Sequence, residues 1–240
     1  MRVPVIQGLI DRRILVNYRV DPGALVGVLP PPFEPKIIGG YGIAGICLIR
    51  LKDIRPNWLP VSIGLSSENA AHRIAVRWKA KGEWHEGVYI PRRDTDSRLN
   101  TLVGGRLFPG IHYHAHFDVQ ETGEDFRVAL KSVDDNTSMN VHAKLSTQLP
   151  TSTIFGSLEA VSAFFEAGAM GYSPAHHEGN YDGLELRTFN WYVQPLQVEQ
   201  VSSSFFEDED IFPTGSISFD NALLMRGIEH QWHEHETLCV

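Results

Sequence analysis

Three histidines alternate with other residues in one short segment of the sequence, His112-Tyr113-His114-Ala115-His116. In a β-strand, alternate side chains share one face about 7 Å apart, so these imidazoles could act together as proton carriers or as metal ligands. A polar strand face turned to solvent, or a ligand pocket without a metal, accounts for the same pattern. Histidine is also frequent in the whole chain, because 11 histidines stand beside only six lysines.

A metal site at these histidines would resemble the first motif of the cupins, which would run here from Gly105 to Asp118. The sequence departs from that motif, because six residues rather than five separate Gly105 from His112, and Asp118 replaces the usual glutamate. Ser218 stands where a second cupin motif would have its histidine. A further cluster near the C-terminus, His230, His233 and His235, could bind a metal if the segment is helical, because His230 and His233 would then share a face. We expect no metal and no cofactor, and keep a cupin-like metal-dependent enzyme as an alternative.

Glu68 is a second candidate for proton transfer. It precedes a stretch that becomes apolar, so partial desolvation would make its carboxylate available for acid/base work. An ordinary salt-bridged strand residue is the alternative. Cys47 lies inside the apolar run Ile37–Ile49, where we expect a small core residue. The sequence contains no G-x-S-x-G elbow, phosphate loop or dinucleotide fingerprint, which removes support for several hydrolase, kinase and dehydrogenase functions.

Composition indicates one soluble globular domain over residues 1–240. Hydrophobic residues make up 42% of the 240 and charged residues 21%, and no linker interrupts them. The net charge of −8 argues against nucleic acid or an anionic membrane as a partner. No apolar run approaches the roughly 20 residues that a membrane-spanning helix needs, and no export signal is evident, so a cytoplasmic location is the default expectation.

Period-2 patterns predict a mainly β fold with a few helices. The expected strands are Ile14–Val20, Tyr41–Lys52, His72–Lys79, Trp84–Pro91, Ile111–Gln120, Phe126–Val133, Met139–Gln148, Leu184–Val193 and Leu196–Phe206. Four turn signals predict antiparallel hairpins: Gly39-Gly40, Lys81-Gly82, Glu121–Gly123 and Asp134–Asn136. Capping and periodicity predict three helices: Asp21 to the prolines at Pro30, Asp94–Leu107 and Ser157–Met170.

Several stretches together are similar to the acetoacetate decarboxylase superfamily, and more closely to a large uncharacterised bacterial family attached to it. Ile14–Pro30 resembles its first strand and helix, and Ser66-Ser67-Glu68 resembles the short strand that carries an active-site glutamate. Gly105-Arg106-Leu107 resembles the end of the helix before the catalytic lysine pair. Val198–Ser204, leading to Phe212-Pro213, resembles the C-terminal strand. The resemblance implies a closed, cone-shaped β-barrel of antiparallel and mixed strands with about three flanking helices and a ligand site in its lumen.

In the decarboxylases that the chain resembles, a lysine forms a Schiff base, and its pKa is depressed by burial and by a neighbouring lysine. Counting forward from Gly105-Arg106, that pair falls on Tyr113-His114, which cannot form an iminium. Lys131 and Lys144 lie near no matching motif. We therefore expect chemistry without a Schiff-base lysine. Periodicity leaves open whether the histidine face or the tyrosine face of the 111–120 segment lines the lumen.

Our first hypothesis is a small-molecule enzyme, lyase-like or hydrolase-like, that acts on a carboxylate or keto compound in the barrel lumen. Its candidate catalytic residues are Glu68, His112, His114 and Tyr113. Its candidate substrate-binding residues are Arg12, Arg19, Arg106 and His72. The alternative is a non-catalytic ligand-binding or sensory barrel, suggested by the missing lysine. The resemblance also makes a homo-oligomer an expectation.

Overall fold

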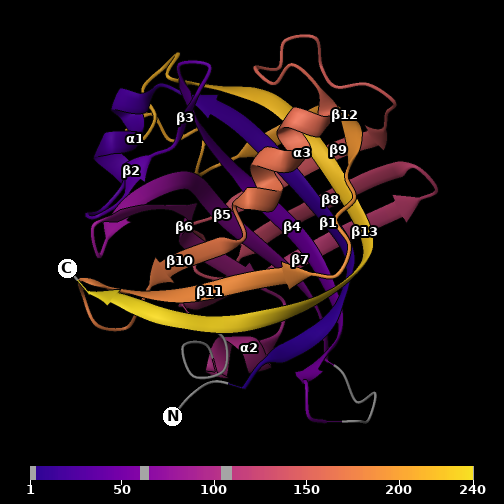
Figure 1. Ribbon diagram of the computed structural model, residues 1–240. Coiled ribbons are helices and arrows are strands. Elements are labelled where there is room, and N and C mark those ends of the chain that lie inside the picture. The colour runs from indigo at the N-terminus through magenta and orange to yellow at the C-terminus, as the bar shows by residue number, and fades with distance from the viewer. Residues whose placement is uncertain (1–3, 60–64, 104–109, 240) are drawn as a thin grey trace.

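The computed structural model describes residues 4–59, 65–103 and 110–239 (Figure 1). The fold is mainly β, as the sequence predicts, and within the described residues it contains one 13-stranded mixed sheet and three short helices. The strands are β1 (Ile6–Val20), β2 (Glu34–Pro35), β3 (Ile37–Ile38), β4 (Tyr41–Pro56), β5 (Leu65–Ala80), β6 (Glu83–Thr95), β7 (His112–Thr122), β8 (Asp125–Ser132), β9 (Ser138–Leu145), β10 (Met170–Pro174), β11 (Asn180–Thr188), β12 (Gln194–Ser203) and β13 (Ile217–Cys239). The helices are α1 (Pro22–Val28), α2 (Arg98–Val103) and α3 (Leu158–Ala167).

Local sequence signals place most of these elements. Each of the nine expected strands overlaps an observed one, and all four expected turns join antiparallel partners. Asp21 caps α1 by accepting a hydrogen bond of 2.7 Å from the backbone N–H of Gly23, and Ser157 caps α3 at the backbone N–H of Ala160. No helix of the described residues is long and apolar enough to span a membrane.

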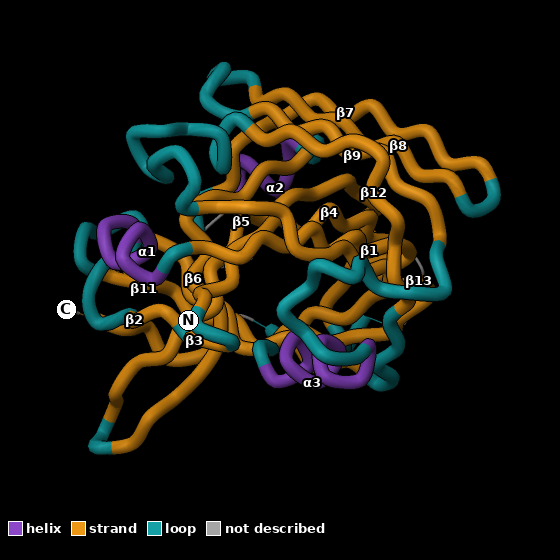
Figure 2. The backbone as a smooth tube through the Cα atoms, turned by 90° about the horizontal axis from the view of Figure 1, so that it is seen from above, coloured by secondary structure: helices purple, strands orange, loops and turns teal. Residues whose placement is uncertain are grey.

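The sheet closes on itself twice (Figure 2). One ring has nine strands, because the parallel pairing of β6 with β7 completes the path β1, β4, β5, β6, β7, β8, β9, β12, β13. A second ring has seven strands, because β10 pairs with β6 and β11 pairs with both β10 and β13. The rings share β1, β4, β5, β6 and β13, which are 13 to 23 residues long. This arrangement confirms the expected closed, mixed β-barrel.

The two faces of the shared strands carry two different cores, because successive side chains of a strand point to opposite faces. Ile14, Val16 and Ile46 belong to a core that fills the nine-strand ring with side chains of β8 and β9. Leu15 and Cys47 belong to the other core, which α3 covers. Figure 2 shows α3 on the opposite side of β1 and β4 from β7, β8 and β9. The second face therefore belongs to the seven-strand ring.

The C-terminal histidines lie in a long strand and not in a helix. β13 pairs with β1, β11 and β12, so its backbone groups are used in the sheet. The helical face that would bring His230 and His233 together therefore does not form. His230 is fully buried beside Trp232, whereas the Nδ1 atom of His235 lies 3.2 Å from the Tyr172 hydroxyl.

Candidate functional site

A cavity lies inside the seven-strand ring, and all seven strands of that ring contribute to its wall. It consists of two adjoining spaces with empty volumes of about 640 and 800 Å³, part of which is open to solvent. Both spaces are lined by Ile49, Ala71, Arg93, Leu184 and Trp232, so they lie side by side, and we call these two spaces together the central cavity.

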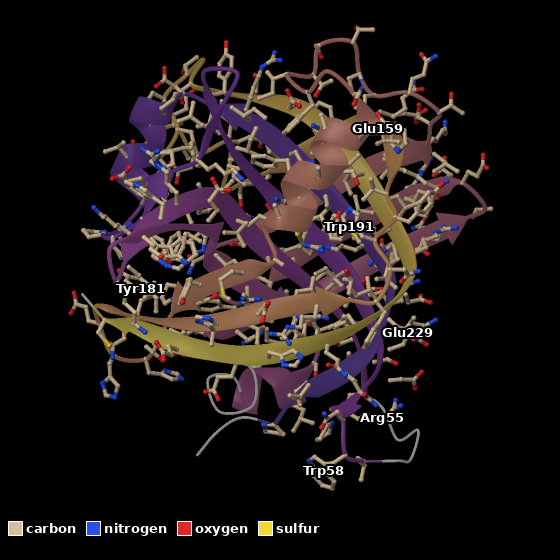
Figure 3. All side chains as sticks on the ribbon, in the orientation of Figure 1. Arg55, Trp58, Glu159, Tyr181, Trp191 and Glu229 are labelled. Atoms are coloured by element: carbon tan, nitrogen blue, oxygen red, sulfur yellow. The ribbon has the colours of Figure 1, made fainter. Side chains whose placement is uncertain are left out.

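Aromatic side chains line the α3 side of the central cavity. Phe165 of α3 and Trp191 line it there, and the indole N–H of Trp191 donates a hydrogen bond of 2.9 Å to the Ser162 hydroxyl. Figure 3 labels Trp191 beside this helix. Glu166 also lines the cavity and is exposed, so the space reaches the protein surface at this rim.

Three arginines on three strands line the central cavity: Arg13 of β1, Arg73 of β5 and Arg93 of β6. None of them forms an ion pair with a carboxylate among the described residues. The Nε atom of Arg13 is buried and has no hydrogen-bond partner there. Positive charge without a carboxylate partner in a semi-enclosed space favours an anionic ligand.

Arg73 is the most deeply buried of the three, with 4% of its surface exposed. Its Nε atom lies 3.0 Å from the Sγ atom of Cys47, and its Nη2 atom donates to the side-chain oxygen of Asn17. Asn17 in turn donates to Asn221, which donates to the buried carboxylate of Asp220. The guanidinium is thus fixed by neutral groups and one thiol.

Arg93 and His112 meet at the other part of the cavity. The Arg93 Nε atom donates a hydrogen bond of 3.0 Å to the Ser173 hydroxyl, and burial lowers the pKa of Arg93 to about 10, which leaves it charged at neutral pH. Burial, assisted by the charge of Arg93, lowers the pKa of His112 to about 4, so its imidazole is neutral. Asp94 lines the same space, and burial raises its pKa although Arg92 opposes the rise.

Glu68 does not face the central cavity, although its neighbours Ser67 and Asn69 line it. Its side chain, 12% exposed, points to the opposite face, where it accepts hydrogen bonds from Arg12 and, at 2.6 Å, from Arg50. Glu121 joins the same cluster through Arg12 at 3.2 Å. The carboxylate that the sequence singles out for proton transfer is therefore held between two guanidinium groups.

The structure places the other sequence-derived candidates at scattered positions. Of the four proposed catalytic residues, only His112 lines the central cavity. The His114 Nδ1 atom lies 3.2 Å from the backbone oxygen of Thr95, and the Tyr113 ring stacks 4.2 Å from the guanidinium of Arg92. Of the proposed substrate-binding residues, Arg12 lies in the Glu68 cluster, and His72 is fully buried against aromatic rings. Arg19 donates hydrogen bonds to Ser152 and Ser218. Arg106 lies outside the described residues.

The structure decides which face of β7 points inward. Ala115 is fully buried, and Phe117 and Val119 pack against the core of the nine-strand ring. His114 and His116 therefore point away from that core, with their rings 5.7 Å apart. His112 reaches the central cavity because it stands at the start of the strand, beside Arg93 in the parallel register.

Sequence reasoning missed the residues that carry charge into the cavity: Arg13, Arg73 and Arg93. One signal was available for Arg73, because it is the only cation within the stretch Asn69–Val76 and stands in the middle of an apolar strand. The sequence could not show whether Arg12 or Arg13 faces the cavity, because adjacent side chains of a strand point to opposite faces and only the tertiary structure shows which face is which. Arg93 could not be distinguished from Arg92 for the same reason. Among the described residues, no group of three or more histidine, cysteine or acidic side chains is arranged to hold a metal ion.

Comparison with known protein families shows to which family the chain belongs. A model of the DUF2071 family, described as an uncharacterized conserved protein, matches residues 10–221. The chain belongs to the DUF2071 family. No curated protein matches the sequence of this DUF2071 chain.

Solved structures share the fold of the DUF2071 chain. Acetoacetate decarboxylase from Legionella pneumophila superposes with a TM-score of 0.61 at 13% identity, over 98% of this chain and 88% of that one. An acetoacetate decarboxylase-like enzyme from Sphingomonas wittichii RW1 gives 0.59 at 13% identity, over 100% and 94%. The enduracididine biosynthesis enzyme MppR, complexed with pyruvate, gives 0.58 at 12% identity, over 100% and 91%. At these identities the likeness concerns the fold, while function depends on the site.

Proposed function

We propose that this DUF2071 chain is a small-molecule enzyme that acts on a carboxylate or keto compound in the central cavity. The observation that carries the proposal is the convergence of Arg13, Arg73 and Arg93, none with a carboxylate partner among the described residues, on one enclosed space. Guanidinium groups bind carboxylates through paired hydrogen bonds and also stabilise negative charge that develops on a carbonyl oxygen. MppR, which shares the fold, is described in complex with pyruvate, a compound of this class.

His112 is the proton carrier in this proposal. Its neutral imidazole lines the cavity beside Arg93, and the negative charge of a bound carboxylate would favour its protonation there. Asp94 lines the same wall, where its carboxylate is held by Arg92 at 2.8 Å. A reaction that moves a proton next to a carbonyl group, such as decarboxylation or dehydration, fits this set of groups.

Lysine chemistry plays no part in the proposal. The sequence contains six lysines, all within the described residues, and none lines the central cavity. Lys36 lies at a narrow extension beyond Arg73, where its ammonium group is paired with Glu86 at 2.5 Å. The lysine that shares a small pocket with Arg13 and Arg73 is thus already paired with a carboxylate, which disfavours a Schiff base there.

Ligand titration tests the proposal. Isothermal calorimetry with pyruvate and acetoacetate should show saturable binding, whereas acetone, which has no carboxylate, should bind much more weakly. Arg93→Met should weaken binding by about tenfold or more, because it removes a charged partner from an enclosed site. Arg187→Met is the matched control on β11, since Arg187 is exposed and paired with Glu185. Equal affinity for acetone, or no effect of Arg93→Met, would refute the proposal.

Binding without turnover is the second candidate function. It is favoured by the position of Glu68, whose carboxylate is occupied by Arg12 and Arg50 and does not reach the ligand space. Nuclear magnetic resonance of a bound keto acid over time distinguishes the two functions. Conversion that is lost in His112→Gln supports the enzyme, and unchanged ligand with retained affinity supports the binding protein.

A further inference from the structure

Cys47 is a thiol in the wall of the central cavity, on the strand between those that carry Arg13 and Arg73. Its Sγ atom accepts a hydrogen bond of 3.0 Å from Arg73 Nε and one of 3.5 Å from Arg13 Nη2. Arg93, which lines the same space, supplies a third positive charge. The thiol is free, so it is available for chemistry.

Charge balance indicates that this thiol is ionised. Arg73 is almost completely buried, and a buried charge without a counter-charge is strongly unfavourable. No carboxylate of the described residues pairs with Arg73, and its second hydrogen-bond partner is the neutral amide of Asn17. Among its hydrogen-bond partners, only Cys47 can carry a negative charge. The thiolate is thus the internal counter-ion of the guanidinium.

The pKa of the thiol agrees with this geometry. Burial by itself raises the pKa of Cys47, but the charges of Arg73 and Arg13 and the hydrogen bonds that both donate outweigh burial, so the pKa lies below the ordinary value of a cysteine. Thiolates, and not thiols, are the nucleophilic form of cysteine. A thiolate in a cavity that attracts anions is placed to meet an electrophilic carbon of a bound ligand.

We propose that Cys47 is the covalent nucleophile of the central cavity and adds to the carbonyl carbon of a keto acid; this rests on the proposed function above. The thiolate sulfur forms a bond to the carbonyl carbon, and the π electrons of the C=O bond move to its oxygen. That oxygen takes up a proton from solvent, which gives a neutral hemithioketal. Arg93 or Arg13 holds the carboxylate of the ligand and stabilises the transient alkoxide.

Selective alkylation of the wild-type protein tests the thiolate without any keto acid. Iodoacetate and iodoacetamide are nearly the same size and differ in charge, and both react by forming an S–C bond as iodide leaves. At about pH 6, where an ordinary thiol is almost entirely protonated, Cys47 should react, and its iodoacetate-to-iodoacetamide rate ratio should exceed that of exposed Cys239 by about tenfold. Peptide mass mapping assigns each product. An inert Cys47, or a ratio equal to that of Cys239, overturns the proposal.

Carbon-13 NMR with pyruvate labelled at its carbonyl carbon tests the addition itself. Wild-type protein should convert part of the bound ketone signal to a tetrahedral carbon signal that is absent with Cys47→Ser. Retained circular dichroism of Cys47→Ser shows that the loss is not unfolding, and Cys239→Ser should behave as the wild type. If Cys47 is alkylated but no protein-dependent tetrahedral signal appears while pyruvate binds, nucleophilic addition is refuted and the proposed function stands. If Cys47 is alkylated and no keto acid binds, both the addition and the proposed substrate class fail.

Discussion

The Nε atom of Arg73 lies 3.0 Å from the Sγ atom of Cys47, across two neighbouring strands that form one wall of the central cavity. On the other face of these strands, Arg50 and, from the neighbouring strand β1, Arg12 hold the carboxylate of Glu68. The two clusters are close in sequence and opposite in role. The Glu68 cluster neutralises its charges within the protein. The cluster of Arg73 and Cys47 leaves guanidinium groups facing open space.

Removing the Arg73 charge should make Cys47 an ordinary buried thiol. In Arg73→Met, burial remains and raises the pKa of Cys47, whereas the largest opposing charge is gone. Alkylation of Cys47 by iodoacetamide at neutral pH should slow by about tenfold or more, because less thiolate is present. The pH dependence of the rate measures this. Arg77→Met, on the same strand and exposed beside Glu34, is the control and should leave the rate unchanged.

Glu68→Gln should destabilise the fold while leaving the cavity groups in place. Arg12 is 1% exposed, and Glu68→Gln leaves it Glu121, at 3.2 Å, as a carboxylate partner, so the loss should be about 2 kcal/mol, less than for a buried charge left without any partner. Urea unfolding measures the loss. Glu199→Gln removes an exposed partner of Lys144 and should change the free energy of unfolding little. A Glu68→Gln protein as stable as the wild type would contradict a structural role for the cluster.

His72 should make the protein sensitive to mild acid. Burial, together with the charge of Arg92, lowers the pKa of His72 to about 3, below the value of about 6.5 in the unfolded chain. As the pH falls, the unfolded chain takes up the proton first, so this contribution to stability is present above pH 6.5 and is lost toward pH 3. From pH 7.5 to pH 5 the loss is about 2 kcal/mol.

His72→Leu should reduce the acid loss by about 2 kcal/mol and leave the shares of His112 and His230, whose pKa values burial also lowers to about 4. Leucine suits the site, because neither ring nitrogen of His72 has a hydrogen-bond partner among the described residues and its neighbours Phe205 and Phe206 are apolar. Urea unfolding at both pH values is the measurement. His116→Leu, at an exposed position of β7, serves as the comparison and should keep the wild-type slope. If His72→Leu loses as much free energy of unfolding between pH 7.5 and pH 5 as the wild type does, groups other than His72 cause the loss.

Borohydride reduction in the presence of acetoacetate should leave the protein mass unchanged. An imine needs a neutral amine beside the bound ketone, and no lysine lines the central cavity. Mass spectrometry of the intact protein measures the outcome. A covalent adduct mapped to Lys36, the lysine at the narrow extension beyond Arg73, would show that keto compounds bind there and react with an amine.

The local elements of this protein were readable from the sequence. Alternating apolar residues placed nine strands, turn residues such as Lys81-Gly82 placed the hairpins, and Asp21 and Ser157 marked the helix starts. These signals are local, because strand periodicity, turn geometry and capping involve residues close in the chain. The long strand β13 escaped notice, since its polar C-terminal half has no single apolar face and is fixed by pairing with β1 and β11.

The sequence by itself indicated a mainly β fold, which its resemblance to the acetoacetate decarboxylase superfamily made a closed barrel, and it identified His112 as a site candidate. Only the tertiary structure decided which charged side chains share a space. Arg12 and Arg13 are adjacent in sequence, yet they face different rings because side chains alternate along β1. Arg13, Cys47, Arg73 and Arg93 come together because the four strands that carry them pair side by side and curve around one cavity.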